Sequence, residues 1–319
     1  MLRLIAATLF TLVVTGPAPA ADTFPTRTIR WIVPYPPSGT TDILARIVGA
    51  RLAERIGQQV LIDNRPGAGN NIGTELAVRA TPDGYTVFLV NPANAINTTL
   101  YTNLTFDFLR DMGPVAGIVR VPNVMEITTT LPVKTVGEFI AHVKANPGKV
   151  ILASSGIGTS VHLSGELFMS MTGLKMTHVP YKGAGPALPD LIGGQVHVMF
   201  DNMPSSIEFI RSGKLRALAV TTAKRSSQLP ETPTVAETVP GYEASAWFGM
   251  GVPKGAPEDV VARLNREVNA ILAEPKMRAR LAELGGDPIA GTPAEFWTLH
   301  TAETEKWAKV VRSSGARVD

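Results

Sequence analysis

The segment IRWIVPYPPSGTTDILARIVGARLAERIG, residues 29–57, contains one complete strand, loop and helix. Residues 29–33 are apolar and rich in β-branched side chains, which predicts a buried strand. From residue 41 to residue 56 the apolar residues recur at the helical period, and Gly57 is a typical helix end. The same order then returns, with a strand at 60–63, a helix at 74–80 and a strand at 86–90. This alternation predicts a parallel sheet with helices on its faces.

A second unit of the same kind begins beyond Pro122. Its sequence pattern predicts a helix at 135–145 and strands at 124–128, 150–153, 177–179, 196–200 and 215–221. The last part of the chain is predicted to be helical at 258–273, 276–284 and 293–312, with Thr292 as N-cap and Pro293 at the first helical position. Because no long linker separates the units, we expect short crossing strands to join two α/β lobes around a ligand cleft.

The N-terminus predicts export from the cytoplasm. Arg3 is followed by an apolar stretch at 4–14 and by small residues up to Ala21, which is typical of a secretory signal peptide cleaved after Ala20 or Ala21. The alternative is a membrane anchor, but the apolar stretch is shorter than the roughly 18 residues of a membrane span. We therefore expect residues 1–21 to be removed.

The composition excludes several classes of function. The chain has no cysteine, which rules out disulfides, thiol catalysis, thiolate metal sites and a lipid-modified cysteine. Lys and Arg number 30 against 27 Asp and Glu, and no basic run is present, so the sequence predicts no nucleic-acid partner. With 45% hydrophobic residues in 319, the chain can bury a sizeable core, which we expect to be divided into two domains.

Three polar, glycine-rich loops each lead into a predicted helix. They are PYPPSGTTD at 34–42, NRPGAGNNIG at 64–73 and SSGIGTS at 154–160. In an open parallel sheet such loops meet beyond the carboxyl ends of the strands, and the first N–H groups of a helix attract anions. The pattern predicts a site for a small anion such as a carboxylate. The alternative is ordinary helix capping, which the same residue types favour.

Three charged residues near these loops have more than one interpretation. Asp42 begins the first helix and is expected to brace its loop, because a carboxylate complements the helix dipole there. Asp201 either accepts a hydrogen bond from a ligand amine or holds a turn. Lys182, in the motif YKGAG, either pairs with a ligand carboxylate, lies in solvent or closes the lobes on each other.

The motif searches favour no catalytic activity. Gly156 and Gly158 begin a dinucleotide fingerprint, but Val161 stands where a third glycine is required. We find no phosphate-binding loop, no nucleophile elbow and no metal-ligand spacing among the five histidines, so we predict no cofactor, no metal and no catalytic residue. An exported hydrolase that uses Ser154 or Ser155 with His162 remains an alternative. Packing or capping is favoured for His162, since no carboxylate is visibly placed to orient it.

Longer motifs give the chain a family resemblance. It resembles the substrate-binding proteins of tripartite tricarboxylate transporters, the Bug family of periplasmic receptors, over nearly the whole mature chain. In order, the matching motifs are RTIRWIVPYPPSGTTDILAR, VLIDNRPGAGNNIGTELAVRATPDGYT, SSGIGTSVHLSGELF, HVPYKGAGPALPDLIGGQV, LPETPTVAETVPGYEASAWFGMGVPKGAP and RLNREV. The resemblance implies a two-lobed periplasmic-binding-protein fold of type II, with lobe 1 formed by 22–123 and 246–319 and lobe 2 by 124–245.

The resemblance also implies a function. We expect a monomeric periplasmic receptor that captures a small carboxylate, such as a dicarboxylate, an acidic amino acid, a citrate-like acid or an aromatic acid. It would hand this ligand to a membrane permease of one large and one small subunit. A receptor that docks on a membrane sensor remains an alternative, because the sequence does not separate transport from signalling.

By position, the resemblance assigns ligand binding to a set of loop residues. They are Tyr35, Ser38, Gly39, Thr40, Asp42, Asn71, Asn91, Ser154, Ser155, Gly158, Thr159, Tyr181 and Asp201. Ser38 departs from the family pattern, which has glycine at this position, so its side chain either narrows the pocket or donates to the ligand. Trp247 and Phe248 either form an apolar wall at the hinge or belong to the core.

Overall fold

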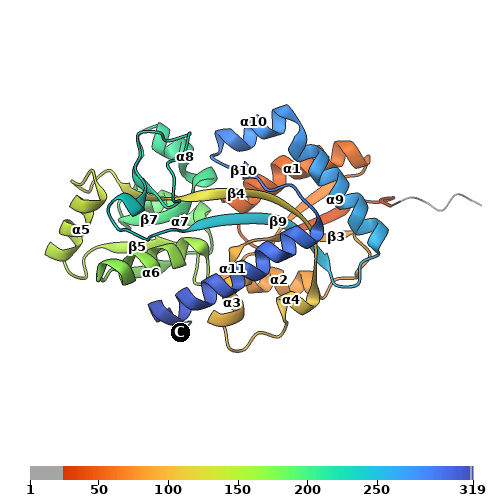
Figure 1. Cartoon of the computed structure of the whole chain (residues 1–319), viewed down its shortest axis with the longest axis horizontal. Coiled ribbons are helices and arrows are strands. Elements are labelled where there is room, and N and C mark those ends of the chain that lie inside the picture. The colour runs from red at the N-terminus through yellow and green to blue at the C-terminus, as the bar shows by residue number, and fades with distance from the viewer. Residues whose placement is uncertain (1–23, 317, 319) are drawn as a thin grey trace, which may run out of the picture.

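The computed structural model describes residues 24–316 and 318, so the predicted signal peptide lies outside the described residues. Ten strands form one curled sheet with the order β2-β1-β3-β9-β4-β7-β5-β6, and β8 and β10 also pair with β4. Helices lie on both sides of this sheet (Figure 1). The predicted α/β fold is confirmed, although β4 and β9 add antiparallel pairings to the predicted parallel sheet.

The first half of the sheet follows the predicted alternation. Its strands β1 (Ile29–Val33), β2 (Val60–Asn64) and β3 (Thr86–Val90) are parallel. The helices that follow them are α1 (Thr40–Ile56), α2 (Asn71–Val78) and α3 (Pro92–Leu100), with a short 3₁₀ turn at Ala68–Asn70 before α2. As predicted, α1 ends at Gly57, which adopts the left-handed conformation.

The second half of the sheet repeats this arrangement. Strands β5 (Ile151–Ser154), β6 (Thr177–Pro180) and β7 (Val198–Asn202) are parallel, and β8 (Leu215–Val220) is antiparallel to β4. The helices of this half are α5 (Val136–Ala145), α6 (Ser160–Thr172), α7 (Ala184–Ile192) and α8 (Met203–Arg211).

Two strands join the halves, as expected, but they are long rather than short, and the sequence showed only part of them. β4 (Met112–Thr128) pairs with β9 (Ser245–Pro253) along its first part and with β7 and β8 along its last part. Figure 1 shows both strands crossing the middle of the molecule. Glycines interrupt the sequence pattern by which these strands could be recognised. At Gly249 of β9 an added Cβ would collide with the ring of Phe296. Glycine is therefore required there by close helix packing.

The C-terminal helix contacts both halves. The last elements are α9 (Glu258–Ala273), α10 (Pro275–Glu283), β10 (Asp287–Pro288) and α11 (Pro293–Ser314), and the short α4 (Phe108–Asp111) precedes β4. Thr292 caps α11 as predicted, in a capping box with Glu295. Phe296 packs with Trp247 in the first half, whereas Trp307 packs with Phe168 and its neighbours in the second half. The helix thus runs along both halves (Figure 1).

Trp247 is fully buried and belongs to the core. No helix among residues 24–316 and 318 has the length and hydropathy needed to cross a membrane.

Candidate functional site

A small cavity, which we call the inner cavity, lies where five helices begin. The first turns or N-caps of α1, α3, α6, α7 and α8 all reach it, and its volume is about 30 Å³. It is lined by Tyr35, Gly39, Thr40, Thr41, Asn91, Pro92, Ser155, Thr159, Ser160, Val161, Ala184, Asn202 and Phe248. None of these residues carries a charged side chain.

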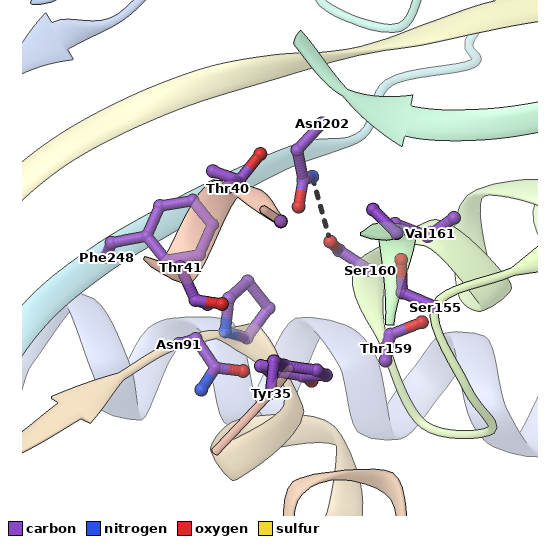
Figure 2. Close-up of a pocket in the computed structure, with 13 residues that line it drawn as sticks. Tyr35, Thr40, Thr41, Asn91, Ser155, Thr159, Ser160, Val161, Asn202 and Phe248 are labelled. Carbon is purple, nitrogen blue, oxygen red and sulfur yellow. Dashed lines mark hydrogen bonds between the residues drawn. The ribbon is translucent and has the colours of Figure 1, made fainter. Parts of the chain in front are cut away.

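The lining residues come from both halves of the sheet. Figure 2 shows Tyr35, Thr41 and Phe248 on one side and Ser155 and Thr159 on the other. The predicted loops therefore do converge on one space.

Hydrogen bonds fix the upper side of this space. The Asn202 amide donates from Nδ2 to Ser160 Oγ at 3.3 Å (Figure 2). The hydroxyl oxygens of Thr40 and Ser205 lie 3.0 Å apart, so they join α1 of the first half to α8 of the second.

The helix starts make the inner cavity electropositive without a cation. The N-caps of α1, α7 and α8 are Gly39, Gly183 and Asn202, and none of them makes a side-chain capping bond. In α3 and α6 the Asn91 and Thr159 side chains each accept from one early N–H. Most of the first N–H groups thus have no intrahelical acceptor, and the positive ends of five helix dipoles meet at the cavity.

Asp42 braces the loop before α1, as predicted, and does not line the inner cavity. Its carboxylate accepts from Ser38 N at 3.1 Å, from Asn64 Nδ2 at 3.1 Å and from Arg46 Nε at 3.0 Å. Burial alone would raise the pKa of Asp42, but the hydrogen bonds from Arg46, Ser38 and Asn64 lower it. These bonds hold Ser38 at a φ of +72°, a conformation that glycine adopts more easily.

Asp201 also lies behind the cavity wall rather than in it. It is 1% exposed and accepts from the hydroxyls of Ser205 and Ser206 at 2.5 Å and 2.8 Å. Ser206 Oγ also lies 2.7 Å from Glu126 Oε1. A hydroxyl has one hydrogen, so Ser206 donates to one carboxyl group and must accept a hydrogen bond from the other. The Asp201–Glu126 pair therefore holds at least one proton.

The pKa directions assign this proton to Glu126. Burial, reinforced by the nearby charge of Asp201, raises the pKa of Glu126 well above its ordinary value. Burial also raises the pKa of Asp201 to about 6, although hydrogen bonds from Ser205 and Ser206 oppose the shift. Glu126 is therefore the weaker acid of the pair and carries the shared proton, while Asp201 is the more acidic group. Asp201 thus holds the start of α8 in place, which fits the turn-holding interpretation.

A histidine pair stands behind the loop of α6. Ser154 Oγ lies 2.7 Å from His178 Nε2, and the His178 ring stacks on His162 at a centroid distance of 4.4 Å. Burial, with the neighbouring His162, lowers the pKa of His178 to about 4. Glu166 Oε1 lies 3.4 Å from His162 Nε2, so the sequence analysis missed a carboxylate one helical turn away that orients this ring.

This geometry does not support Ser154 as the nucleophile of the hydrolase alternative. Ser154 contacts His178 rather than His162, it is fully buried, and it lines no part of the inner cavity. Among the residues that the structure describes, no group of three or more His, Asp or Glu side chains could hold a metal ion.

Four more predicted residues lie outside the inner cavity for clear structural reasons. Ser38 is exposed to solvent. Asn71 accepts from Asn97 Nδ2 at 2.9 Å, and Gly158 packs directly against the same Asn97 side chain. The Tyr181 hydroxyl donates to Asp190 Oδ2 at 2.6 Å.

A second cavity, which we call the outer cavity, adjoins the inner one and has a volume of about 210 Å³. Tyr35 and Ser155 line both cavities. The outer cavity is also lined by Gly67, Ala68, Gly69, Asn70, Tyr101, Gly156, Ile157, Pro180, Tyr181 and Lys182.

The loops of the two halves meet at glycines, which we call the glycine seam. A Cβ added to Gly183 would lie 2.7 Å from Pro36 Cδ, closer than real Cβ atoms come. Gly69 lies against the carbonyl oxygen of Ile157 and leaves no room for a side chain. The halves can meet this closely only because these positions lack side chains.

Comparison with known proteins identifies the family. A family model described as "Tripartite tricarboxylate transporter family receptor" matches residues 44–316. The chain belongs to this receptor family. The resemblance seen in the sequence is thereby confirmed.

Three solved structures are similar to this receptor along nearly their whole length. "R. palustris Rpa4515 with adipate" is 41% identical, with a TM-score of 0.90, over 92% of this chain and 100% of that one. Periplasmic binding protein BugD is 33% identical, with a TM-score of 0.89, over 92% and 99%. MatC from Rhodopseudomonas palustris, with bound malate, is 31% identical, with a TM-score of 0.86, over 90% and 100%. The predicted periplasmic-binding-protein fold is confirmed.

The sequence analysis predicted six of the lining residues and missed the others. Tyr35, Gly39, Thr40, Asn91, Ser155 and Thr159 were assigned to the site and line the inner cavity. Ala184 was missed, since an apolar residue at the start of α7 gives no polar signal. Asn202 lines the cavity instead of its neighbour Asp201, because successive side chains of a strand point to opposite faces.

Proposed function

We propose that this receptor captures a small carboxylate in the inner cavity and delivers it to a membrane permease of the tripartite tricarboxylate type. One observation carries the proposal: five helix starts from both halves converge on a cavity without charged side chains. Main-chain dipoles of this kind stabilise an anion with no need for a cation. The adipate and malate in the titles of Rpa4515 and MatC support a carboxylate ligand.

The proposal includes the lobe boundaries and the location. We infer that the halves act as lobe 1, residues 22–123 and 246–319, and lobe 2, residues 124–245, which close on the ligand by bending β4 and β9. The name of BugD and the signal-like N-terminus support a periplasmic location, and we infer that the chain acts as a monomer. We infer that six of the predicted residues contact the ligand, together with Ser160, Ala184 and Asn202.

The test is calorimetric titration of the mature chain with a panel of mono-, di- and tricarboxylic acids. The protein is unfolded and refolded first to remove bound ligand. We expect at least one acid to release heat and to raise the thermal unfolding midpoint, since a ligand at a hundredfold excess over its Kd adds about 2.7 kcal/mol of stability. If no acid in the panel binds, the proposal is wrong.

A substitution locates the site. Ala184→Asp would place a carboxylate in the inner cavity, and like charges at a desolvated site cost several kcal/mol, so we expect at least about a hundredfold loss of affinity. Ala294→Asp is the matched control, because Ala294 is exposed in the first turn of α11 and lines neither cavity. Equal affinities of the two variants would place the ligand elsewhere.

A further inference from the structure

We propose that Ser205 is a positioning residue for ligand capture: it accepts a hydrogen bond from Thr40 and so fixes the start of α1 against the start of α8. The proposal rests on the proposed function and adds to the site a residue that lines neither cavity. Thr40 belongs to the first half of the sheet and Ser205 to the second. The contact between their hydroxyls therefore joins the two halves beside the inner cavity, which Thr40 lines.

The direction of this hydrogen bond follows from the number of hydrogens. The Ser205 hydroxyl has two acceptors in its own half, Asp201 Oδ2 at 2.5 Å and the main-chain oxygen of Asn202 at 2.8 Å. A hydroxyl has one hydrogen, so whichever of these two oxygens accepts it, none is left for Thr40. Thr40 must therefore donate, and Ser205 must accept, across the 3.0 Å between the two hydroxyl oxygens.

The Thr40 hydroxyl is consequently not a donor to the ligand. Thr40 is the first residue of α1, whose N-cap Gly39 makes no side-chain capping bond, so Thr40 still offers its main-chain N–H to an anion. The main chain of Thr40 thus serves the ligand, whereas its side chain serves the opposite half.

Ser205 is a prepared acceptor because its own half holds its side chain. Asp201, at the end of β7, is 1% exposed, and its Oδ2 also lies 2.8 Å from the Ser206 hydroxyl. Asp201 and Asn202 keep the hydrogen of Ser205 turned into the second half. A lone pair of Ser205 is then left for Thr40, so the halves can close without rearranging this side chain.

The surroundings strengthen the bond. Thr40 is 4% exposed and Ser205 is 7% exposed. Ile43 and Ile47 of α1 pack against the apolar cluster that contains Ile207 of α8. Water therefore cannot easily replace the bond, and a hydrogen bond is stronger in such a low-dielectric environment. A side chain added at the glycine seam would clash, whereas here a hydroxyl can be removed without a clash.

The experiment measures the Kd and the binding rates of the panel acids that bind wild type, with malate and adipate first. Thr40→Val removes the hydroxyl and keeps the shape of the side chain. We expect the Kd to rise about tenfold through faster dissociation, with association changed less than about twofold, because the ligand meets the open receptor before the bond forms. Thr40→Ser retains the hydroxyl and should bind within about twofold of wild type.

A double-mutant cycle shows whether the two hydroxyls act as one unit. Ser205→Ala should also raise the Kd about tenfold, and its combination with Thr40→Val should raise the Kd no further, since both changes remove the same bond. If the Thr40 hydroxyl contacted the ligand itself, the two losses would multiply to about a hundredfold.

Ser206→Ala is the matched control. Ser206 is fully buried and contacts the same Asp201 oxygen, but both of its side-chain partners, Asp201 and Glu126, lie within residues 124–245. The variant should lower stability as Ser205→Ala does, yet change the Kd less than about twofold. Thermal unfolding without ligand measures this stability and verifies the fold of every variant.

The outcomes separate this proposal from the proposed function. If Thr40→Val leaves the Kd unchanged, if the double variant loses a hundredfold, or if Ser206→Ala weakens binding as much as Ser205→Ala, the positioning role of Ser205 is wrong while carboxylate capture stands. If wild type binds no acid, both proposals are wrong.

Discussion

The two walls of the inner cavity are each backed by a buried aspartate, and the two aspartates are held in opposite ways. Asp42, behind α1, faces Arg46, whose side chain is 53% exposed. Asp201, in β7 behind α8, accepts from the hydroxyls of Ser205 and Ser206, and Ser206 links it to Glu126. One wall is therefore stabilised by a charge pair that water can partly replace, and the other by a dry network in which a single proton is essential.

The comparison teaches that similar positions in two α/β units need not have similar energetics. Both aspartates fix the start of a helix that borders the cavity. After loss of Asp42 water can reach Ser38 and Arg46, whereas loss of Asp201 removes one hydrogen-bond acceptor from each of the buried hydroxyls of Ser205 and Ser206. The following predictions test this difference.

The largest expected effect is on Asp201→Ala. We expect the free energy of unfolding to fall by about 3 kcal/mol, because the change removes the hydrogen bonds of two buried hydroxyls to Asp201 and opens a cavity. Denaturant unfolding at neutral pH measures it. Glu208→Ala on the same helix is the control, since Glu208 is exposed and should change stability by less than about 0.5 kcal/mol. Equal losses in the two variants would show that the dry network is unimportant.

The second expected effect is a pH dependence of the free energy of unfolding, caused by Asp201. The pKa of Asp201 is about 6 in the folded chain, against an ordinary 3.8. Below pH 3.8 the group is protonated in both states; between 3.8 and 6 the unfolded chain releases a proton that the folded chain keeps. The contribution of Asp201 to stability therefore falls as pH rises through this window, by roughly 2 to 3 kcal/mol, and does not change above it.

The measurement compares wild type with Asp201→Asn near pH 4 and near pH 7. Asn does not titrate. The free energy of unfolding of the variant, relative to that of wild type, should therefore rise by about 2 kcal/mol or more from pH 4 to pH 7. Asp42 contributes in the opposite direction, because its lowered pKa gives stability that is lost as pH falls below 3.8, but it is common to both proteins. A constant difference across the range would contradict the raised pKa of Asp201.

The smallest loss is expected for Asp42→Ala, whose free energy of unfolding should fall by about 1 to 2 kcal/mol. The change removes the acceptor for Ser38 N and a favourable first-turn charge, but water can reach the exposed Ser38 and Arg46. Glu54→Ala, an exposed change in α1, is the control and should cost less than about 0.5 kcal/mol. A loss as large as that of Asp201→Ala would remove the distinction between the walls.

The sequence predicted the parts of the fold whose signals are local. Strand β3 and helix α9 were predicted at their observed bounds, because a β-branched run and a regular apolar period mark them. The first part of β4 and all of β9 were missed, since their glycines and prolines resemble a loop. α3 was missed too, because its buried asparagines satisfy one another through contacts that only the folded chain provides.

The candidate site was predicted in outline but not in its details. Loops after parallel strands must meet at one edge, so Tyr35, Asn91 and Thr159 could be brought together from sequence. Side chains alternate between the two faces of a strand, so whether Asp201 or Asn202 faces the cavity depends on where β7 ends. The outer cavity depends on Tyr101, which follows the missed helix α3.

The glycine seam has a consequence for how such a receptor can change its ligand. Contacts between Gly183 and Pro36 and between Gly69 and Ile157 involve almost no exchangeable side chain. Substitutions at neighbouring positions are therefore expected to leave these contacts between the halves unchanged. Evolution or protein engineering can alter selectivity at Tyr35, Ala184 and Lys182 while the docking of the halves is inherited unchanged, so one scaffold can serve many acids.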